Sequence, residues 1–257
     1  MTTITKSFLE TKTMTKRNLL KSLNNRDRLI DNLVTPILDL LLFVFVLGGA
    51  MGQVVEVRYV DYIVPGTFLM CAAQCSTAVA ASISSDLQKG IVDRYRSMPI
   101  SISSFLNGHV IESVIRTIVS LILMLVVALV IGFRPQTTLV NGLLVIALLL
   151  LFSFTITWVS AVYGLLIKGP EGVGSLTIFV LGFSYLSSAL LPTNTFPKII
   201  KLFAENQPVT PVVEAVRRLL LSQPVEGNYL KAVYWCLGLS AVFIILANRL
   251  FNKKVYQ

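Results

Sequence analysis

Charged residues are scarce in this sequence. They make up 14% of its 257 residues, whereas 54% are hydrophobic, and the mean hydropathy is +0.76. Three long stretches hold no charge at all: 24 residues between Asp61 and Asp86, 33 between Arg134 and Lys168, and 26 between Glu171 and Lys198. A soluble domain needs polar residues on its surface, and about 20 apolar residues are enough to cross a bilayer as a helix. The sequence therefore predicts an integral membrane protein.

Residues and motifs for catalysis and nucleotide binding are also missing. The single histidine, His109, lies in H-V-I-E, which is no zinc-binding H-E-x-x-H, so a metalloprotease or a Ser–His hydrolase would depend on it alone. No G-x-x-x-x-G-K-[ST] occurs, and the glycine-rich KGPEGVG at 168–174 is better interpreted as a tight turn. We expect no catalytic site, metal or cofactor on this chain.

Cysteine is rare, and the three that occur lie in predicted spans. Cys71 and Cys75 are four residues apart on one helix face, which is not the spacing of a metal clip, and Cys236 is far along the chain. We interpret all three as small apolar filling residues.

The apolar segments predict an all-α fold with six transmembrane helices. Beside the three long charge-free stretches, three weaker segments have the required length, one of them interrupted by Asp39. The predicted spans are approximately 33–50, 62–85, 105–131, 140–166, 173–191 and 231–249.

The N-terminal segment 1–31 differs from the transmembrane domain predicted for 32–257. It has no continuous apolar core for a signal peptide, and it holds seven Lys/Arg against three acids. Apolar residues such as Phe8, Leu19, Leu23 and Ile30 recur at helical spacing, which favours an amphipathic helix on the inner membrane surface over a solvated tail.

The distribution of basic residues predicts the orientation. Placing both termini in the cytoplasm leaves 14 Lys/Arg in the inner segments and 6 in the outer ones, as the positive-inside rule requires. The net charge of +9 then reflects topology and attraction to anionic lipids, so we expect membrane lipids, and no nucleic acid, as partners.

Three charges fall inside predicted spans. Glu112 and Arg116 are four residues apart with the acid first, the order that suits a helical ion pair, and Arg116 could also extend to the interface. Asp39 lies within the first span, where a basic partner or a water-lined cavity would accommodate it. All three are candidate pathway residues, although they form no relay typical of a proton-coupled carrier.

A polar stretch, DLQKGIVDRYRSMPIS at 86–101, separates the second and third spans. After Gly90, the residues Ile91, Tyr95 and Met98 share one helix face, and Pro99 ends the segment. A helix of two turns needs a packing partner, so we interpret it either as a peg that docks into a cytoplasmic protein or as a helix lying on the lipid surface. The residues assigned to this docking helix are Gly90, Ile91, Asp93, Arg94, Tyr95, Arg96, Met98 and Pro99.

The outer connection 192–229 contains five prolines and predicts two short amphipathic helices, at 197–204 and 211–221. In the second, valines and leucines face one side and charged residues another. Such helices need an apolar surface, so we expect them to dip into the outer leaflet. The residues assigned to this re-entrant pair are Pro208, Thr210, Pro211, Glu214 and Arg217.

The chain resembles the permease subunits of ABC-2 type transporters, in particular the daunorubicin-resistance and nodulation-export branch of bacterial exporters. The resemblance rests on YIVPGTF at 62–68, D…G…DRYRSMPIS at 86–101, FLNGHVIESVIR at 105–116 and NQPVTPVVEAVRRLL at 206–220. It covers nearly the whole chain in order. Gln88 and Lys89 depart from the pattern, since related sequences often carry an acid just before the glycine.

The resemblance implies a half-transporter in the bacterial plasma membrane that exports a drug, an antibiotic or a lipid-like compound. It implies a dimer with a second copy, or with a homologue, and a separate ABC ATPase subunit that holds ATP and Mg. The 86–101 segment would be the coupling helix, and the N-terminal segment would also contact the ATPase. The alternatives are an ion-coupled secondary transporter, a membrane-embedded enzyme that depends on His109, and a sensor or scaffold.

Overall fold

The computed structural model describes residues 3–51, 58–91, 102–225 and 227–256, and within these ranges the extended regular elements are all helices. The long helices are α1 (Thr3–Leu23), α2 (Arg26–Leu42), α4 (Tyr59–Gln88), α6 (Ile102–Ile131), α7 (Leu139–Leu166), α8 (Val173–Tyr185) and α11 (Asn228–Tyr256). Shorter helices are η1 (Phe43–Leu47), α3 (Gly48–Met51), η2 (Pro170–Gly172), η3 (Thr193–Thr195), α9 (Lys198–Asn206) and α10 (Val209–Leu220).

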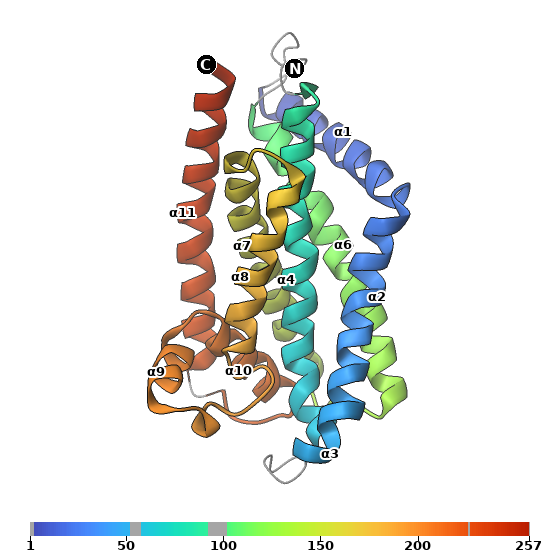
Figure 1. Cartoon of the computed structure of the whole chain (residues 1–257), viewed down its shortest axis with the longest axis vertical. Helices are drawn as coiled ribbons and strands as arrows, with labels where there is room; N and C mark the ends of the chain where they lie inside the picture. The colour runs from blue at the N-terminus through green and yellow to red at the C-terminus, as the bar shows by residue number, and fades with distance from the viewer. Residues whose placement is uncertain (1–2, 52–57, 92–101, 226, 257) are drawn as a thin grey trace.

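The long helices except α1 form one bundle (Figure 1). Four of them, α4, α6, α7 and α11, are long and apolar enough to cross a membrane. Two shorter apolar helices are Asn32–Val46, which runs from α2 into η1, and Val173–Tyr185, which is α8. The all-helical membrane protein is thus confirmed, and the count of six spans stays a prediction. The helix predicted to extend to 191 ends at Tyr185, and a run of turns follows it.

Helix α4 is the centre of the bundle. In its most apolar 18-residue window, 89% of the residues are buried, against 28% in α6 and 22% in α11. Its mean hydropathy is also lower than that of α6 or α7, because it carries many serine, threonine and alanine residues. These small and polar residues face other helices instead of lipid, which explains how a less apolar segment remains inside the bundle.

Glycines allow two of the helix pairs to approach closely. A Cβ atom added at Gly164 of α7 would lie 2.7 Å from the carbonyl oxygen of Ala80 in α4. One added at Gly108 of α6 would lie 2.6 Å from Cβ of Met14 in α1. Both separations are below van der Waals contact, so any larger residue would push the helices apart.

Hydroxyl groups join the central helices. Ser76 of α4 hydrogen-bonds to Ser153 of α7, with 3.1 Å between the hydroxyl oxygens, and Ser153 donates to Thr117 of α6 at 3.1 Å. Thr155 of α7 donates to the carbonyl oxygen of Cys236 in α11. These bonds connect four helices without placing a charge in the charge-free segments.

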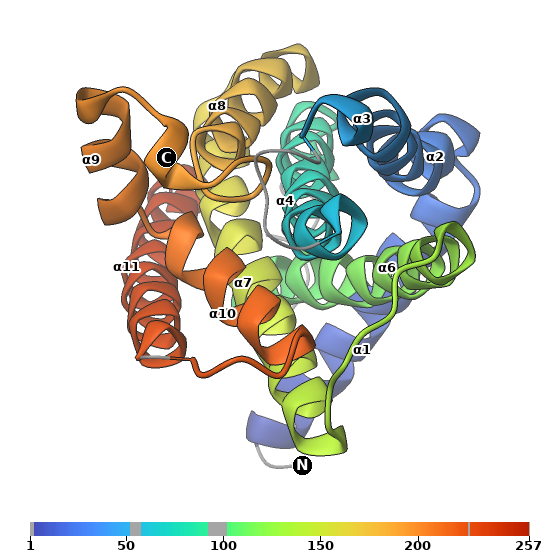
Figure 2. The ribbon, with the colours of Figure 1, turned by 90° about the horizontal axis from the view of Figure 1, so that it is seen from below.

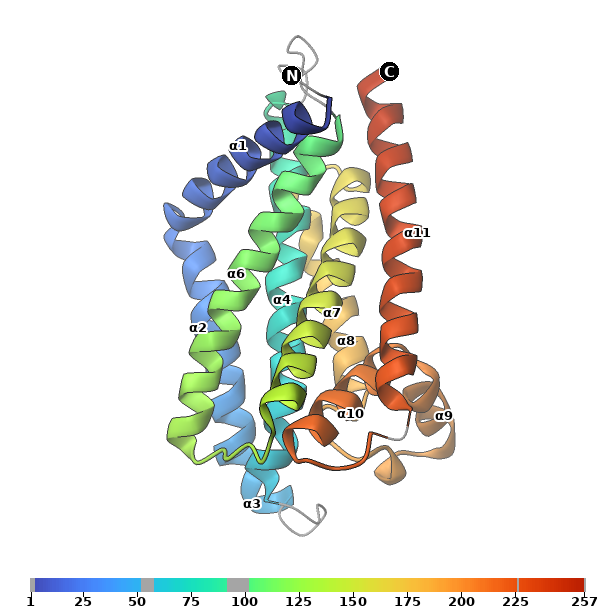
Figure 3. The same cartoon turned by 180° about the vertical axis from the view of Figure 1, so that it is seen from behind.

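The two ends of the bundle are built differently. At the end where both termini lie, α1 runs obliquely across α6 (Figure 3). At the opposite end, α10 lies across the ends of the long helices and α9 sits at the rim (Figure 2). The predicted pair of short helices is therefore present. The second begins at Val209, two residues before the predicted start, so Pro211 lies in its first turn, where no helical N–H is needed.

Candidate coupling site and polar interior

Helix α4 ends in a buried carboxylate followed by a glycine cap. Asp86 lies in the last turn, and its side chain has no exposed surface. The helix closes with hydrogen bonds from Lys89 N to Ser85 O and from Gly90 N to Leu87 O, both 3.1 Å. Gly90 has φ +64°, the left-handed conformation that commonly ends a helix and that favours glycine.

Three basic side chains surround Asp86. Arg17 and Lys21, one turn apart on α1, both form ion pairs with it, and Lys21 Nζ lies 2.5 Å from Oδ1. His109 of α6 places Nε2 3.4 Å from Oδ2, which is within ion-pair reach without the geometry of a hydrogen bond. His109 is itself buried, with the Phe105 ring edge-on at 4.9 Å.

This Asp86 cluster connects three helices at one point. The carboxylate of Asp86 belongs to α4, and its basic partners lie on α1 and α6. A displacement of the end of α4 would therefore also move α1 and α6. A charge of this kind is tolerated in the interior only when it is paired. We therefore regard the cluster as the best-defined candidate for transmitting movement between helices.

The predicted docking helix begins directly after this cluster. Gly90 and Ile91 are at its start, one and two residues beyond Lys89. The other residues assigned to it, Asp93, Arg94, Tyr95, Arg96, Met98 and Pro99, lie outside the described residues.

Glu112 and Arg116 form the predicted ion pair on α6. Arg116 Nη1 lies 2.9 Å from Glu112 Oε1, and Nη2 donates to the carbonyl oxygen of Cys75 in α4 at 2.8 Å. Both side chains are buried, so Arg116 does not extend to an interface as the alternative interpretation had it. The pair acts as a further polar contact between α6 and α4.

Asp39 has an amide as its partner, where the sequence suggested a base or a cavity. Gln74 of α4 donates from Nε2 to Asp39 Oδ2 at 3.0 Å. Gln74 also lines a groove of about 420 Å³ between α2, α4 and α8. The polar residues that line this groove are Asn32 and Thr35 of α2, Gln74 and Thr77 of α4, and Thr177 of α8.

At the other end, Arg217 of α10 fastens this short helix to the bundle. Its guanidinium donates to the carbonyl oxygens of Tyr62 at 3.1 Å and Ser188 at 2.6 Å, and it pairs with Glu214 at 2.5 Å. The same group lies 3.7 Å above the centre of the Tyr62 ring. Because Arg217 is buried, these contacts replace the hydration that it would have in water.

The remaining residues assigned to this region hold the turn between α9 and α10. Thr210 donates to the carbonyl oxygen of Ala204 at 2.5 Å, and Pro208 is the residue preceding α10. Gln207, which was not predicted, donates to the carbonyl oxygens of Phe183 and Leu186, both at 3.0 Å. These bonds anchor the turn to the end of α8.

The Asp86 cluster itself was missed by the sequence interpretation, in which Asp86 marks only the end of a charge-free run and the first residue of a motif. The available signal was the spacing of Arg17 and Lys21, which places two cations on one face of an otherwise amphipathic helix. Within the described part of the chain, no three His, Cys, Asp or Glu side chains gather as a metal site. The three cysteines are buried and form no disulfide bond.

Known proteins resemble this chain over most of its length. The sequence profile of ABC-2 type transporters matches residues 9–221, from α1 to the end of α10. The chain is 26% identical over 230 residues to the daunorubicin resistance ABC transporter permease protein DrrB1 of Streptomyces coeruleorubidus, covering 88% of this chain and 80% of that protein. It is 27% identical over 239 residues to the probable doxorubicin resistance ABC transporter permease protein DrrC of Mycobacterium tuberculosis, covering 91% and 84%. The chain therefore belongs to the ABC-2 type transporter family.

Proposed function

We propose that this chain is the membrane subunit of an ATP-driven exporter in a bacterial plasma membrane. In this proposal, a separate ABC ATPase subunit binds ATP and Mg and docks against residues 90–99, with both termini on its side. Two copies of the chain form the transport pathway, each contributing six crossings. The exported compound is amphipathic, as the daunorubicin and doxorubicin in the names of the two relatives suggest.

The Asp86 cluster is the observation that carries the proposal. A partner that pushes on residues 90–99 would act on the end of α4 within about two turns of Asp86. The ion pairs to Arg17 and Lys21 and the proximity of His109 would pass that movement to α1 and α6. Packed interfaces move between discrete arrangements, so a rigid tilt of three connected helices is a physically reasonable response.

The groove between α2, α4 and α8 supports a pathway on this face of the subunit. Its lining combines hydroxyl and amide groups with apolar residues such as Val173 and Leu181, which suits a molecule with both characters. Asp39 accepts a hydrogen bond from the lining residue Gln74, and its charge would favour a compound with a cationic group.

The test is to replace the docking residues and measure hydrolysis and export separately. We expect Arg94→Ala/Tyr95→Ala to leave membrane insertion unchanged while ATP hydrolysis by the complex no longer drives uptake of the exported compound into inverted vesicles. The matched control is Arg249→Ala/Tyr256→Ala, which removes the same two residue types from α11. Normal coupled export by the Arg94/Tyr95 variant would show that the segment has no part in coupling.

The same vesicles distinguish the main alternatives. An ion-coupled carrier would stop when a protonophore collapses the proton gradient and would ignore removal of ATP. The proposed exporter behaves in the opposite way. A membrane enzyme would alter its substrate without any partner and would lose activity on replacement of His109.

A further inference from the structure

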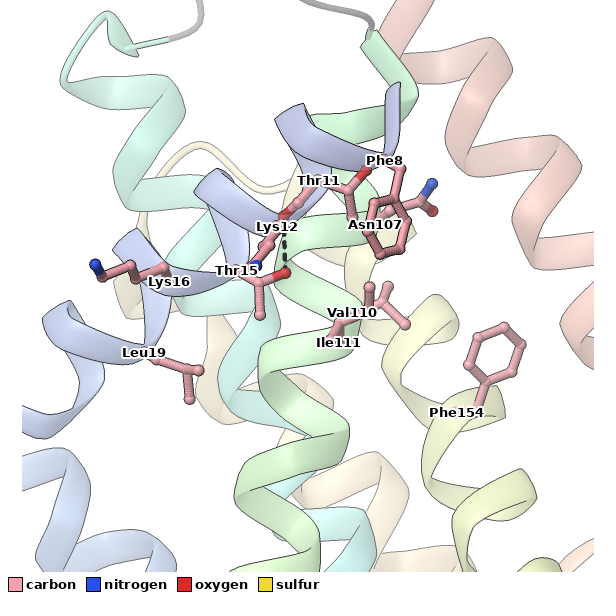
Figure 4. Close-up of a pocket in the computed structure, with 10 residues that line it drawn as sticks. All are labelled: Phe8, Thr11, Lys12, Thr15, Lys16, Leu19, Asn107, Val110, Ile111 and Phe154. Atoms are coloured by element: carbon pink, nitrogen blue, oxygen red, sulfur yellow. Dashed lines mark hydrogen bonds between the residues drawn. The ribbon is translucent and has the colours of Figure 1, made fainter. Parts of the chain in front are cut away.

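A large groove lies between the amphipathic helix α1 and the bundle helices α6 and α7. Its volume is about 990 Å³, and its walls come from α1, α6 and α7 (Figure 4). The lining is mainly apolar, with Phe8 and Leu19 on α1, Val110 and Ile111 on α6, and Phe154 on α7. A space of this size and character is large enough for much of a lipid acyl chain and too apolar to be a favourable site for water alone.

The rim of the groove carries two cations. Lys12 and Lys16 are one turn apart on α1, both are exposed, and both line the groove. Thr11, Thr15 and Asn107 add polar groups near them. Among the described residues, Lys12 and Lys16 have no carboxylate within ion-pair distance.

Four of the basic residues of α1 thus fall into two pairs with different roles. Arg17 and Lys21 turn toward the bundle and neutralise Asp86, whereas Lys12 and Lys16 remain at the groove. The close approach of Gly108 to Met14 fixes α1 against α6 at this level, so the groove has a firm wall. Two unneutralised cations above an apolar slot fit a ligand with an anionic head and an apolar tail.

We propose that this groove binds one anionic phospholipid, with its phosphate between Lys12 and Lys16 and an acyl chain along Val110, Ile111 and Phe154. The site is distinct from the groove between α2, α4 and α8, and it requires neither ATP nor the transported compound. The bound lipid would fill the space under α1 and hold this helix at the membrane surface in the position that also orients Arg17 and Lys21.

Native mass spectrometry of the detergent-purified chain with added palmitoyl-oleoyl phosphatidylglycerol tests the site. We expect Lys12→Gln/Lys16→Gln to weaken phosphatidylglycerol binding by roughly 30-fold, because each lysine beside a lipid anion strengthens binding about fivefold. The control Lys253→Gln/Lys254→Gln removes the same charge from exposed positions on α11 and should bind as the wild type does. Equal losses in the two variants would mean general electrostatic attraction and would overturn the proposal.

A second pair of variants tests the apolar wall without changing charge. Ile111→Trp should fill the groove and lower phosphatidylglycerol binding, whereas Ile118→Trp, at a similarly exposed position on α6 outside the groove, should not. Unchanged binding by Ile111→Trp would place the lipid elsewhere and refute the assignment.

Two other ligands and one co-purification experiment complete the test. Palmitoyl-oleoyl phosphatidylcholine should bind much more weakly than phosphatidylglycerol. Equal binding of the two lipids would show that Lys12 and Lys16 do not select an anionic head group. Glycerol phosphate, which has the charge and no chains, should not compete, and competition would indicate a site for free phosphate. If the Lys12/Lys16 variant keeps its lipid but loses a co-purifying ATPase, the groove is a protein-docking surface and the lipid proposal fails.

Discussion

Replacing Asp86 with Asn should loosen α1 from the rest of the molecule. The amide keeps the size of the side chain but removes the charge that Arg17 and Lys21 share. Removing one member of a buried ion pair typically lowers stability by roughly 3–5 kcal/mol. Because the side chains of Arg17 and Lys21 are 31% and 33% exposed, they can recover part of their hydration, so we reduce the expected cost to about 2 kcal/mol.

Amide hydrogen exchange in detergent or nanodiscs measures this loosening directly. A cost of about 2 kcal/mol corresponds to roughly 30-fold faster exchange of the α1 amides through local opening. The control is Glu205→Gln, which breaks the exposed Lys201–Glu205 pair at 3.8 Å and should change exchange very little.

A double variant separates this contact from a general loss of stability. Once Asp86 is Asn, the further change Lys21→Gln should add little, because the two replacements remove the same ion pair. Fully additive effects, or α1 exchange as slow in Asp86→Asn as in Glu205→Gln, would refute the reasoning.

Three further replacements test other parts of the structure. Gly164→Ala should destabilise the detergent-purified protein by about 1–3 kcal/mol in thermal melts, because the added Cβ would meet the backbone of α4. Gly142→Ala on the same helix has open space around the added Cβ and should be neutral or stabilising. Equal effects of the two variants would contradict the close packing. Arg217→Lys should lower the free energy of unfolding by about 2–3 kcal/mol, because lysine loses the carbonyl hydrogen bonds and the stacking contact with Tyr62. Arg218→Lys can still reach a carbonyl oxygen and should lower it little. A reversed order of the melting temperatures would contradict the role of Arg217 in fastening α10. Asp39→Asn should keep expression and folding but slow export of a cationic amphiphile more than that of an uncharged one, and equal slowing would argue against a charge contact.

Features that depend on nearby residues could be predicted from the sequence. The charge-free runs predicted the apolar helices, and the spacing of Glu112 and Arg116 predicted their ion pair. Prolines and apolar spacing predicted the two short helices α9 and α10, with an error of two residues at the start of α10, where Pro211 lies in the first turn.

Contacts between distant segments could not be predicted in this way. Arg17 and Lys21 precede Asp86 by 69 and 65 residues, and Arg217 follows Tyr62 by 155. Choosing these partners requires knowing which helix faces meet, and that depends on packing details such as the space left by Gly108 and Gly164. The burial of Arg116 also followed from the carbonyl oxygen that Cys75 offers on α4, which no local pattern reveals.

The proposal that a separate ATPase drives this subunit is tested most directly by purifying the tagged chain from its native membrane in mild detergent, with crosslinking through residues placed at 94 and 95. We predict stoichiometric recovery of a soluble ATP-hydrolysing protein, crosslinked at these two positions. Recovery of a stable chain with no ATPase, even after crosslinking there, would contradict the proposal.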